Sequence, residues 1–356
     1  MTPKLVNILV GGRSTEHDAS LHSYEHVLSQ IVSDSTGRLA IAGVYYIALD
    51  GGVHPHRAAP WPSSAAELAA PEAEVLLDIV AELARSEWPV FSLLHGNEGE
   101  DGGWQGLAQI VGLQGTFGPV LTSALAMSKF HMSLVATSIE MIRMPRTVFL
   151  DAWSTDADLE TACGTLGSQP SVVKPNNMGA SLFTSYHDVL DLGTLKRIRQ
   201  ELLPYDPEML VQEYVNGDEY TAGCLEAAGE VIALPIIKAV TARGFLGHEE
   251  KHRSGMVRPE ILPADTDLSR RISDVSKNLF RRFRFLGFCR FDYIVGSDGG
   301  LYFLEANALP GLMSGSAYTL MLKTAGYGMI DLIEYCVDAA RARPIRQTQL
   351  RYNIDH

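Results

Sequence analysis

Three oxygen-bearing side chains near the C-terminal end are spaced so that they could hold a metal ion. Asp292 lies in one apolar run, Glu305 and Asn307 lie two residues apart at the end of the next, and Ser-Asp-Gly-Gly at 297–300 joins the runs. This pattern predicts a β-hairpin. Because side chains alternate between the two faces of a strand, Glu305 and Asn307 should face the same side of the sheet.

A ligand set of oxygens without Cys or His suits a hard ion such as Mg²⁺, which keeps other positions for water and substrate phosphates. Arg290 lies two residues before Asp292 and shares its face, where it could clamp an anion. Simple alternation turns Phe291, Tyr293 and Leu304 toward the opposite side. A polar hairpin face in water is the alternative, and the apolar reverse side argues against it.

Two loops rich in small residues could bind phosphate or an oxyanion. Lys174 lies in the predicted strand 171–175, and the loop Asn-Asn-Met-Gly-Ala-Ser follows at 176–181, so an ammonium and backbone N–H groups could hold nucleotide phosphates. No Walker loop or dinucleotide-binding glycine pattern is present. The second loop, 308–311 with 314–316, could aim N–H groups at a tetrahedral centre, although alone it would be only a turn.

Two further candidates follow predicted strands of the N-terminal part. Glu16 ends the segment Gly-Gly-Arg-Ser-Thr-Glu and could bind a substrate ammonium; a helix cap is an equally good interpretation. His95 opens an acidic, glycine-rich loop that lacks the closing glutamate of a calcium-binding EF-hand. A lone histidine there is more often structural, but ligands bind in α/β sheets at such strand ends.

The elements that must position these residues alternate between strand and helix, which predicts an α/β fold with a parallel sheet in its first part. The stretch 54–69, rich in Pro, Ala and Ser, is expected to be a surface excursion. The expected strands are 5–10, 39–48, 90–94, 146–150, 171–175, 210–215, 220–226, 231–235, 290–294 and 301–305. The expected helices are 20–32, 73–86, 121–138, 267–283 and 328–341.

Composition restricts the class of protein. The chain has 356 residues, 46% of them hydrophobic, and a net charge of -13, so a general basic field for nucleic acid or anionic membranes is excluded. No apolar run is long enough for a membrane span, and the N-terminus reads as a first strand rather than a signal peptide. Four scattered cysteines without a disulfide framework are typical of a reducing cytoplasm.

In this order, the motifs resemble those of the D-alanine–D-alanine ligases of the ATP-grasp superfamily, from about residue 4 to residue 341. The motifs that carry the resemblance are Gly-Gly-Arg-Ser-Thr-Glu (11–16), Leu-His-Gly with Gly-Glu-Asp-Gly (94–102), Ser-Ala-Leu-Ala-Met-Ser-Lys (123–129), Val-Lys-Pro (173–175), Val-Gln-Glu-Tyr-Val-Asn-Gly-Asp-Glu-Tyr-Thr (211–221), Arg-Phe-Asp (290–292) and Glu-Ala-Asn-Ala-Leu-Pro-Gly (305–311).

The resemblance implies a mixed α/β fold with ATP bound between the second and third of three domains. These would be a Rossmann-like substrate domain (1–120), a central ATP-grasp subdomain (121–215) and a C-terminal catalytic domain (216–345), followed by a tail (346–356). It also implies a homodimer, small-molecule substrates such as D-alanine, and no nucleic-acid or membrane partner. ATP and two Mg²⁺ ions, or Mn²⁺ in their place, would be required.

The resemblance also implies the roles of individual residues. The ATP-binding residues would be Lys129, Lys174, Ser181, Gln212, Glu213, Val215, Glu219, Lys251 and Leu304. The metal would be held by Asp292, Glu305 and Asn307. The substrates would meet Glu16, His95, His252, Arg290, Gly311 and Ser316. Catalysis would depend on Glu16, Arg290, Gly311 and Lys251, with Arg290 and the Gly311 N–H stabilising an oxyanion and Lys251 closing a loop over the γ-phosphate.

The chain departs from the family pattern at three positions. Ala180 replaces the first serine of a Ser-Ser pair, Phe183 occupies the place of a glycine, and His252 replaces the tyrosine that follows the loop lysine. The usual hydrogen-bonded link from that serine and tyrosine to the counterpart of Glu16 cannot form without a hydroxyl at 180. Three hypotheses follow: D-alanyl-D-alanine synthesis for the cell wall, a related amide or ester bond such as D-alanyl-D-lactate, or nucleotide binding without catalysis.

Overall fold

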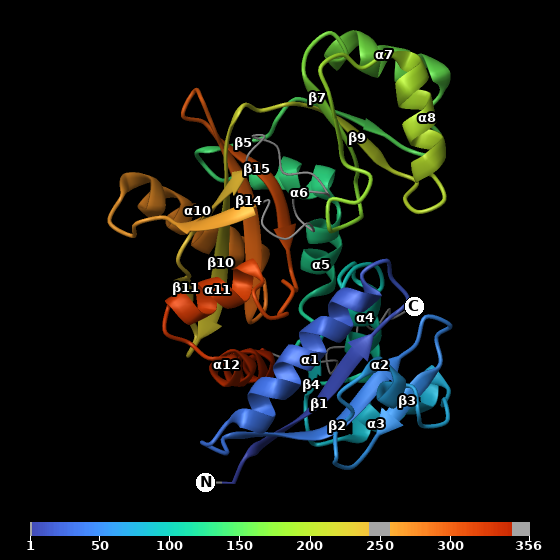
Figure 1. The fold of residues 1–356 in the computed structure, drawn as a ribbon, viewed down its shortest axis with the longest axis vertical. Helices are drawn as coiled ribbons and strands as arrows, with labels where there is room; N and C mark the ends of the chain where they lie inside the picture. The colour runs from blue at the N-terminus through green and yellow to red at the C-terminus, as the bar shows by residue number, and fades with distance from the viewer. Residues whose placement is uncertain (1, 242–256, 344–356) are drawn as a thin grey trace, which may run out of the picture.

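Three β-sheets and their helices make up the chain in the computed structural model, which describes residues 2–241 and 257–343 (Figure 1). The N-terminal sheet, drawn in blue, lies below a small green sheet and a large yellow-to-red sheet in this view. The candidate residues lie on all three, so the arrangement of the sheets decides which of them meet.

The N-terminal sheet is mainly parallel, as predicted. Its strands in spatial order are β3 (Val53–His56), β2 (Leu39–Ile47), β1 (Lys4–Gly11) and β4 (Val90–Ser92). β1 pairs in parallel with β2 and β4, whereas β3 is antiparallel to β2. Four helices accompany the sheet: α1 (His17–Ser33), α2 (Ala65–Leu68), α3 (Leu76–Arg85) and α4 (Gly103–Val111). The carboxyl end of β1 therefore leads directly into α1 at the edge where ligands bind in such sheets.

The surface excursion expected at 54–69 is confirmed for its middle, where residues 57–60 are exposed, but both ends of the stretch have regular structure. Its first residues belong to β3, and its last turn forms α2, whose Leu68 is fully buried. The composition suggested a loop because Pro, Ala and Ser together make up most of the stretch. The structure instead caps α2 with the Ser64 hydroxyl, which accepts a hydrogen bond from the Glu67 N–H.

The small sheet carries the predicted phosphate-loop strand. It is antiparallel, with the order β6 (Thr147–Leu150), β9 (Met209–Glu213), β7 (Ser171–Pro175) and β8 (Ser185–His187). Helices α7 (Asp156–Leu166) and α8 (Leu192–Leu202) pack on it through a core that includes Leu159, Leu195 and Val211. The loop between β7 and β8 is hydrogen-bonded to the start of α6 through Asn176 and Met178.

The large sheet has seven strands and contains the predicted hairpin. Its order is β13 (Val257–Ile261), β12 (Ile237–Thr241), β10 (Gly217–Ala227), β14 (Phe288–Gly296), β15 (Leu301–Asn307) and β5 (Ile142–Arg143), with β11 (Glu230–Ala233) paired to β10. One face packs on α5 (Val120–Met127), α6 (Lys129–Ala136) and α10 (Asp267–Phe283). Residues of α11 (Ala317–Thr324) and α12 (Met329–Ala342) share a second core with α1 and β10.

Helix α12 joins the large sheet to the N-terminal sheet. Beyond the shared apolar core, Arg38 lies 2.7 Å from Asp331 and 2.8 Å from Glu334, and Lys4 lies 2.9 Å from Asp338. Such exposed ion pairs contribute little individually, so the buried apolar contact between α1 and α12 is the stronger link.

The single helix expected at 121–138 is two helices. Ser128 separates α5 from α6 in an extended conformation, and its hydroxyl caps α6. The break makes Lys129 the first residue of α6 rather than a residue in the middle of a helix. The sequence suggested one helix because the apolar periodicity continues across the break.

As predicted, no disulfide links the four cysteines, all of which are free thiols. No helix in the described ranges 2–241 and 257–343 is long and apolar enough to cross a membrane.

Candidate active site

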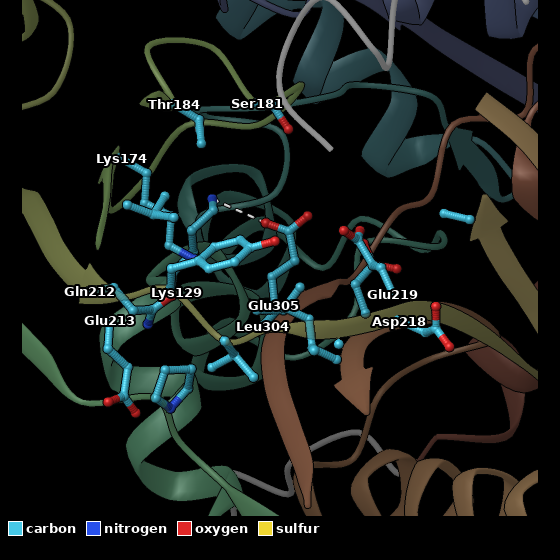
Figure 2. A pocket seen from close by; sticks show the side chains of 18 of the residues that line it. Lys129, Lys174, Ser181, Thr184, Gln212, Glu213, Asp218, Glu219, Leu304 and Glu305 are labelled. Atoms are coloured by element: carbon cyan, nitrogen blue, oxygen red, sulfur yellow. Dashed lines mark ion pairs between the residues drawn. The ribbon is translucent and has the colours of Figure 1, made fainter. Parts of the chain in front are cut away.

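Two adjoining cavities open between the sheets. The first, about 220 Å³, is lined by residues of the small and large sheets and is drawn in Figure 2. The second, about 230 Å³, lies between the N-terminal sheet, the end of β15 and the loop 176–181 after β7. We call this loop the phosphate loop, after its proposed role. Lys129, Met178 and Glu305 line both cavities. A molecule in one cavity can therefore meet a molecule in the other beside these three side chains.

All the predicted site residues in the described part of the chain line at least one of these cavities. Those in the first cavity are Lys129, Lys174, Ser181, Gln212, Glu213, Val215, Glu219, Asp292, Leu304 and Glu305. Those in the second are Glu16, His95, Lys129, Arg290, Glu305, Asn307, Gly311 and Ser316. Lys251 and His252 lie outside the described residues.

The hairpin brings its charged side chains together as the alternation predicted. Asp292 is paired with Glu305, and Arg290 with Asn307, across β14 and β15. The Arg290 guanidinium lies 3.0 Å from the Asp292 carboxylate and 3.9 Å from Glu305. Burial alone would lower the pKa of Arg290, but the two carboxylates outweigh it and hold the pKa above its ordinary value. Arg290 is therefore a permanent cation at the border of the two cavities.

The orientation predicted for Leu304 is wrong. Phe291 and Tyr293 are fully buried on the reverse side as expected, but Leu304 lines the first cavity next to Glu305. The reason is a register shift: Asp292 faces Glu305 and Tyr293 faces Phe303, so β15 carries one extra residue between them. Such a bulge lets two consecutive side chains point to the same face.

Lys129 is held where the two cavities meet. Its ammonium lies 3.4 Å from the Glu305 carboxylate, the pair marked in Figure 2, and donates to the Met178 carbonyl at 2.5 Å. Its backbone N–H donates to the Asn176 carbonyl, and the next N–H, of Phe130, donates to the Asn176 side chain. The phosphate loop and the start of α6 are thus one hydrogen-bonded unit.

Asn176 is the centre of that unit. It is fully buried, and its side-chain N–H₂ donates to the hydroxyl of Ser128 at 2.8 Å and the carboxylate of Glu208 at 2.6 Å. Neighbouring Asn177 binds the Asp206 carboxylate through both its main chain and its side chain. These contacts fix the loop from behind, on the side away from the cavities.

Glu16 extends from the turn before α1 into the second cavity. Burial raises the pKa of its carboxyl group, and the nearby carboxylate of Glu100 raises it further, whereas His95 and Lys129 act in the opposite direction. A carboxylate that is costly to ionise when the cavity is empty gains from an arriving cation. This is the behaviour expected of a group that binds a substrate ammonium.

His95 is buried and lies between two polar groups. Its Nδ1 is 3.5 Å from the Glu100 carboxylate, and its Nε2 is 3.1 Å from the Ser23 hydroxyl. Glu100 also accepts a hydrogen bond from the Gly96 N–H at 2.8 Å. Both ring nitrogens therefore have partners inside the protein.

Gly311 and Ser316 form the wall of the second cavity on the side of the large sheet. The Ser316 hydroxyl donates to the Gly311 carbonyl at 2.8 Å and also caps α11. The Gly311 N–H makes no hydrogen bond to the described residues 2–241 and 257–343 and remains available to a ligand.

Several lining residues were not found from the sequence. Glu100 and Met127 line the second cavity, Thr184 and Lys238 line the first, and Met178 lines both. Glu100 lies in the loop singled out for His95, so the sequence indicated the loop but not which of its acidic residues lines the cavity. Lys238 lies on β12, which was not predicted as a separate strand.

The oxygen donors fit a hard divalent cation. Asp292, Glu305 and Asn307 supply two carboxylates and one amide on one face, with no sulfur or nitrogen ligand among them. In the part of the chain that the structure describes, no group of three or more His, Cys, Asp or Glu side chains could hold a metal. A metal site here would therefore use the amide oxygen of Asn307 and ligands from a bound nucleotide.

Comparison with known proteins identifies the fold and family. The family model of the D-Ala-D-Ala ligase N-terminus matches residues 5–116, and the model of the C-terminus matches residues 141–338. A D-alanine–D-alanine ligase of Geotalea uraniireducens is 32% identical, over 95% of this chain and 96% of its own. The chain belongs to the D-alanine–D-alanine ligase family. A family member from Lactococcus lactis subsp. cremoris is 28% identical over 96% of this chain and 97% of its own.

Solved structures of the ATP-grasp fold superpose on 95% of the chain. The VanG D-Ala:D-Ser ligase of Enterococcus faecalis has a TM-score of 0.76 at 22% identity, over 95% of this chain and 100% of its own. The D-alanine–D-alanine ligase of Bacillus anthracis in complex with ATP has a TM-score of 0.69 at 20% identity, over 95% of this chain and 97% of its own. At this level of identity the similarity establishes the shared ligase fold.

Proposed function

We propose that this protein joins D-alanine to D-alanine with the consumption of ATP, for peptidoglycan precursor synthesis. The observation that carries the proposal is the pair of adjoining cavities, which share Lys129 and Glu305. A nucleotide in the first cavity would present its γ-phosphate beside these side chains to an amino acid in the second. Membership of the family and the ATP complex of the Bacillus anthracis relative support ATP as the substrate.

The first step would be attack of the first D-alanine carboxylate on the γ-phosphorus of ATP, giving an acyl phosphate and ADP. Glu16 would hold the substrate ammonium, and Lys129 with Lys174 would neutralise negative charge on the phosphates. Asp292, Glu305 and Asn307 would hold Mg²⁺ ions, two being expected and Mn²⁺ being able to replace them. When bound, these ions would neutralise charge on the transferred phosphoryl group.

The second step would be attack of the second substrate's amine on the acyl carbon. The tetrahedral intermediate bears an oxyanion, which Arg290 and the Gly311 N–H would stabilise before phosphate leaves. Ser316 would anchor the carboxylate of the second substrate. Gln212, Glu213, Val215, Glu219, Ser181 and Leu304 would hold the nucleoside end of ATP or its phosphates, and Lys251 would close the site against water.

The same proposal includes three further points. The chain would divide into domains after residues 120 and 215, the protein would form a homodimer, and it would be located in the cytoplasm. The scattered free cysteines support a reducing compartment. Family resemblance supports the dimer and the division into domains.

A second candidate is the joining of D-alanine to another amino or hydroxy acid. Ala180 lines the second cavity, has no hydroxyl and lies in the left-handed region at φ +53°. The Enterococcus faecalis neighbour is a D-Ala:D-Ser ligase, so this fold supports more than one second substrate. His252, which lies outside the described residues, is the other departure that favours this candidate.

One panel experiment tests both candidates. The protein is incubated with ATP, Mg²⁺ and D-alanine alone, then with D-alanine paired with D-serine, D-lactate or other acids, and phosphate and coupled product are measured. Phosphate release with formation of D-alanyl-D-alanine from D-alanine alone is expected. Turnover only with a different pair would refute the first candidate in favour of the second, and no turnover with any pair would refute both.

A further inference from the structure

The main chain of Leu312 is held by helix α1 of the N-terminal sheet. The Leu312 N–H donates to the Ser23 hydroxyl at 3.1 Å, and the Leu312 carbonyl accepts from Nδ1 of His26 at 2.6 Å. A carbonyl can only accept, so Nδ1 of His26 carries the proton. The Leu312 side chain is fully buried in the core that α1 shares with α12. Three separate contacts thus attach this residue to an element far away in sequence.

These contacts fix the peptide group that follows Gly311. The N–H of this peptide group, which belongs to Leu312, donates to the Ser23 hydroxyl. Its carbonyl oxygen, which belongs to Gly311, accepts from the Ser316 hydroxyl at 2.8 Å. With both ends of that peptide bonded, the backbone of Gly311 has little freedom to rotate. Gly311 lines the second cavity, so the direction of its own N–H depends on this attachment.

Ser23 is itself held by the buried histidine. It is fully buried and lies 3.1 Å from Nε2 of His95, whose Nδ1 faces the Glu100 carboxylate. A carboxylate facing Nδ1 favours the tautomer with its proton there, so Nε2 accepts from the Ser23 hydroxyl. The hydroxyl then donates to His95 and accepts from Leu312, and both capacities are used. The chain of contacts runs from Glu100 through His95 and Ser23 to the Gly311–Leu312 peptide.

We propose that Ser23 and His26 are positioning residues for the oxyanion site. By fixing Leu312 from α1, they hold the Gly311 N–H in the direction that the tetrahedral intermediate requires. This inference rests on the proposed function, because it assigns the Gly311 N–H to an oxyanion. Neither residue lines the cavity, so neither is expected to touch a substrate.

The test compares Ser23→Ala and His26→Ala with two controls on the same helix, Ser33→Ala and His22→Ala, whose side chains are exposed. A misplaced oxyanion donor should lower kcat by about 10- to 100-fold in the first two variants. Affinity for the phosphinate analogue of the D-alanyl-D-alanine tetrahedral intermediate should fall by a similar factor. The Kd of ATP should stay within about twofold of wild type in all four variants. In the two control variants, kcat and the affinity for the phosphinate analogue should also stay within about twofold of wild type.

A second measurement does not depend on turnover. Hydrogen exchange of a peptide covering residues 309–316 should accelerate in Ser23→Ala, because the Leu312 N–H loses its acceptor, while the amides of α10 keep their protection. Unchanged exchange there, or unchanged kcat in both variants, would overturn the inference. So would an equal loss of ATP affinity, which would indicate general damage to the fold.

The two proposals fail separately. If wild type turns over no substrate pair, the proposed function fails, and hydrogen exchange still decides whether Ser23 holds Leu312. If wild type is active and both Ser23→Ala and His26→Ala are equally active, only the positioning role fails.

Discussion

Glu16 and Gly179 touch across the second cavity. A Cβ placed on Gly179 would lie 2.3 Å from Oε1 of Glu16, closer than side chains approach in proteins. Glu16 belongs to the turn before α1, whereas Gly179 belongs to the loop after β7. The proposed ammonium ligand of the first substrate therefore packs directly on the proposed phosphate loop.

Gly179→Ala should displace the Glu16 carboxylate or the loop. We expect kcat/KM for the first substrate to fall by about 10- to 100-fold, the cost of losing a charged hydrogen bond. Gly164→Ala is the matched control, because nothing lies within 4 Å of a Cβ there. Gly164 lies within α7, so this variant should keep full activity and be more stable by about 0.5–1 kcal/mol. Equal activity of the two variants would contradict the contact.

The raised pKa of Glu16 predicts a pH effect. Binding of an ammonium needs the ionised carboxylate, so kcat/KM for the first substrate should decline on the acid side above the ordinary glutamate value of 4.5. Glu16→Gln should remove this limb and reduce kcat/KM by about 10- to 100-fold. An acid limb at the ordinary value, or one that persists in the variant, would assign the titration to another group.

The same shift predicts how stability depends on pH. Burial raises the pKa of Glu16 in the folded protein above its value in the unfolded chain. At pH values between these two pKa values, the folded protein retains a proton that the unfolded chain has lost. The stability contributed by the protonated group is lost as the pH rises through the folded pKa. At neutral pH, Glu16→Gln should therefore unfold at or above the wild-type temperature, as measured by thermal unfolding. A lower midpoint would mean that the ionised carboxylate stabilises the fold.

Asn176→Ala should loosen Lys129 from the phosphate loop. The variant leaves the Phe130 N–H without its acceptor and removes one of the two amide groups that donate to the Glu208 carboxylate, which should cost about 1–3 kcal/mol of stability. Because Lys129 begins the helix that Asn176 holds, the KM for ATP should rise by about tenfold. Asn278→Ala on the exposed side of α10 is the control and should change neither quantity. A stability loss with an unchanged KM would limit Asn176 to a structural role.

Glu305→Ala should abolish turnover. The side chain lies in both cavities, 3.4 Å from Lys129 and opposite Asp292, so its loss removes a proposed metal ligand. We expect phosphate release to fall more than about 100-fold, with an increased requirement for Mg²⁺. The exposed Glu140→Ala serves as the control. Near-normal phosphate release in Glu305→Ala would refute the metal assignment.

The sequence predicted elements correctly where one periodic signal had clear ends. The helix at 267–283 and the strand at 171–175 match residue for residue. The helix has clear ends because Thr266 caps α10 and one of its faces is apolar and buried. Helix α7 was missed, although Thr155 and Asp158 form a capping box before Leu159. The two-residue strand β5 could not be predicted, since it exists only because β15 lies beside it.

The site was predictable where residue type alone carries the chemistry. Asp292, Glu305 and Arg290 needed only the alternation of a hairpin. Glu100 could not be distinguished from its acidic neighbours, because the path of that loop depends on left-handed conformations at Gly96 and Gly102. The roles of Ser23 and His26 required the packing of α1 against the large sheet, which no local pattern contains.

Because β15 contains an extra residue, Leu304 can face the first cavity while Glu305 and Asn307 keep the face that strict alternation would give them. Phe303 and Ala306 both enter the core, and the two residues between them both face the cavities. Shortening the strand by Leu304 would restore strict alternation and leave Glu305 and Asn307 on their present face. Evolution or design could therefore change the apolar wall of the first cavity by deletion or substitution at residue 304, without moving the proposed metal ligands.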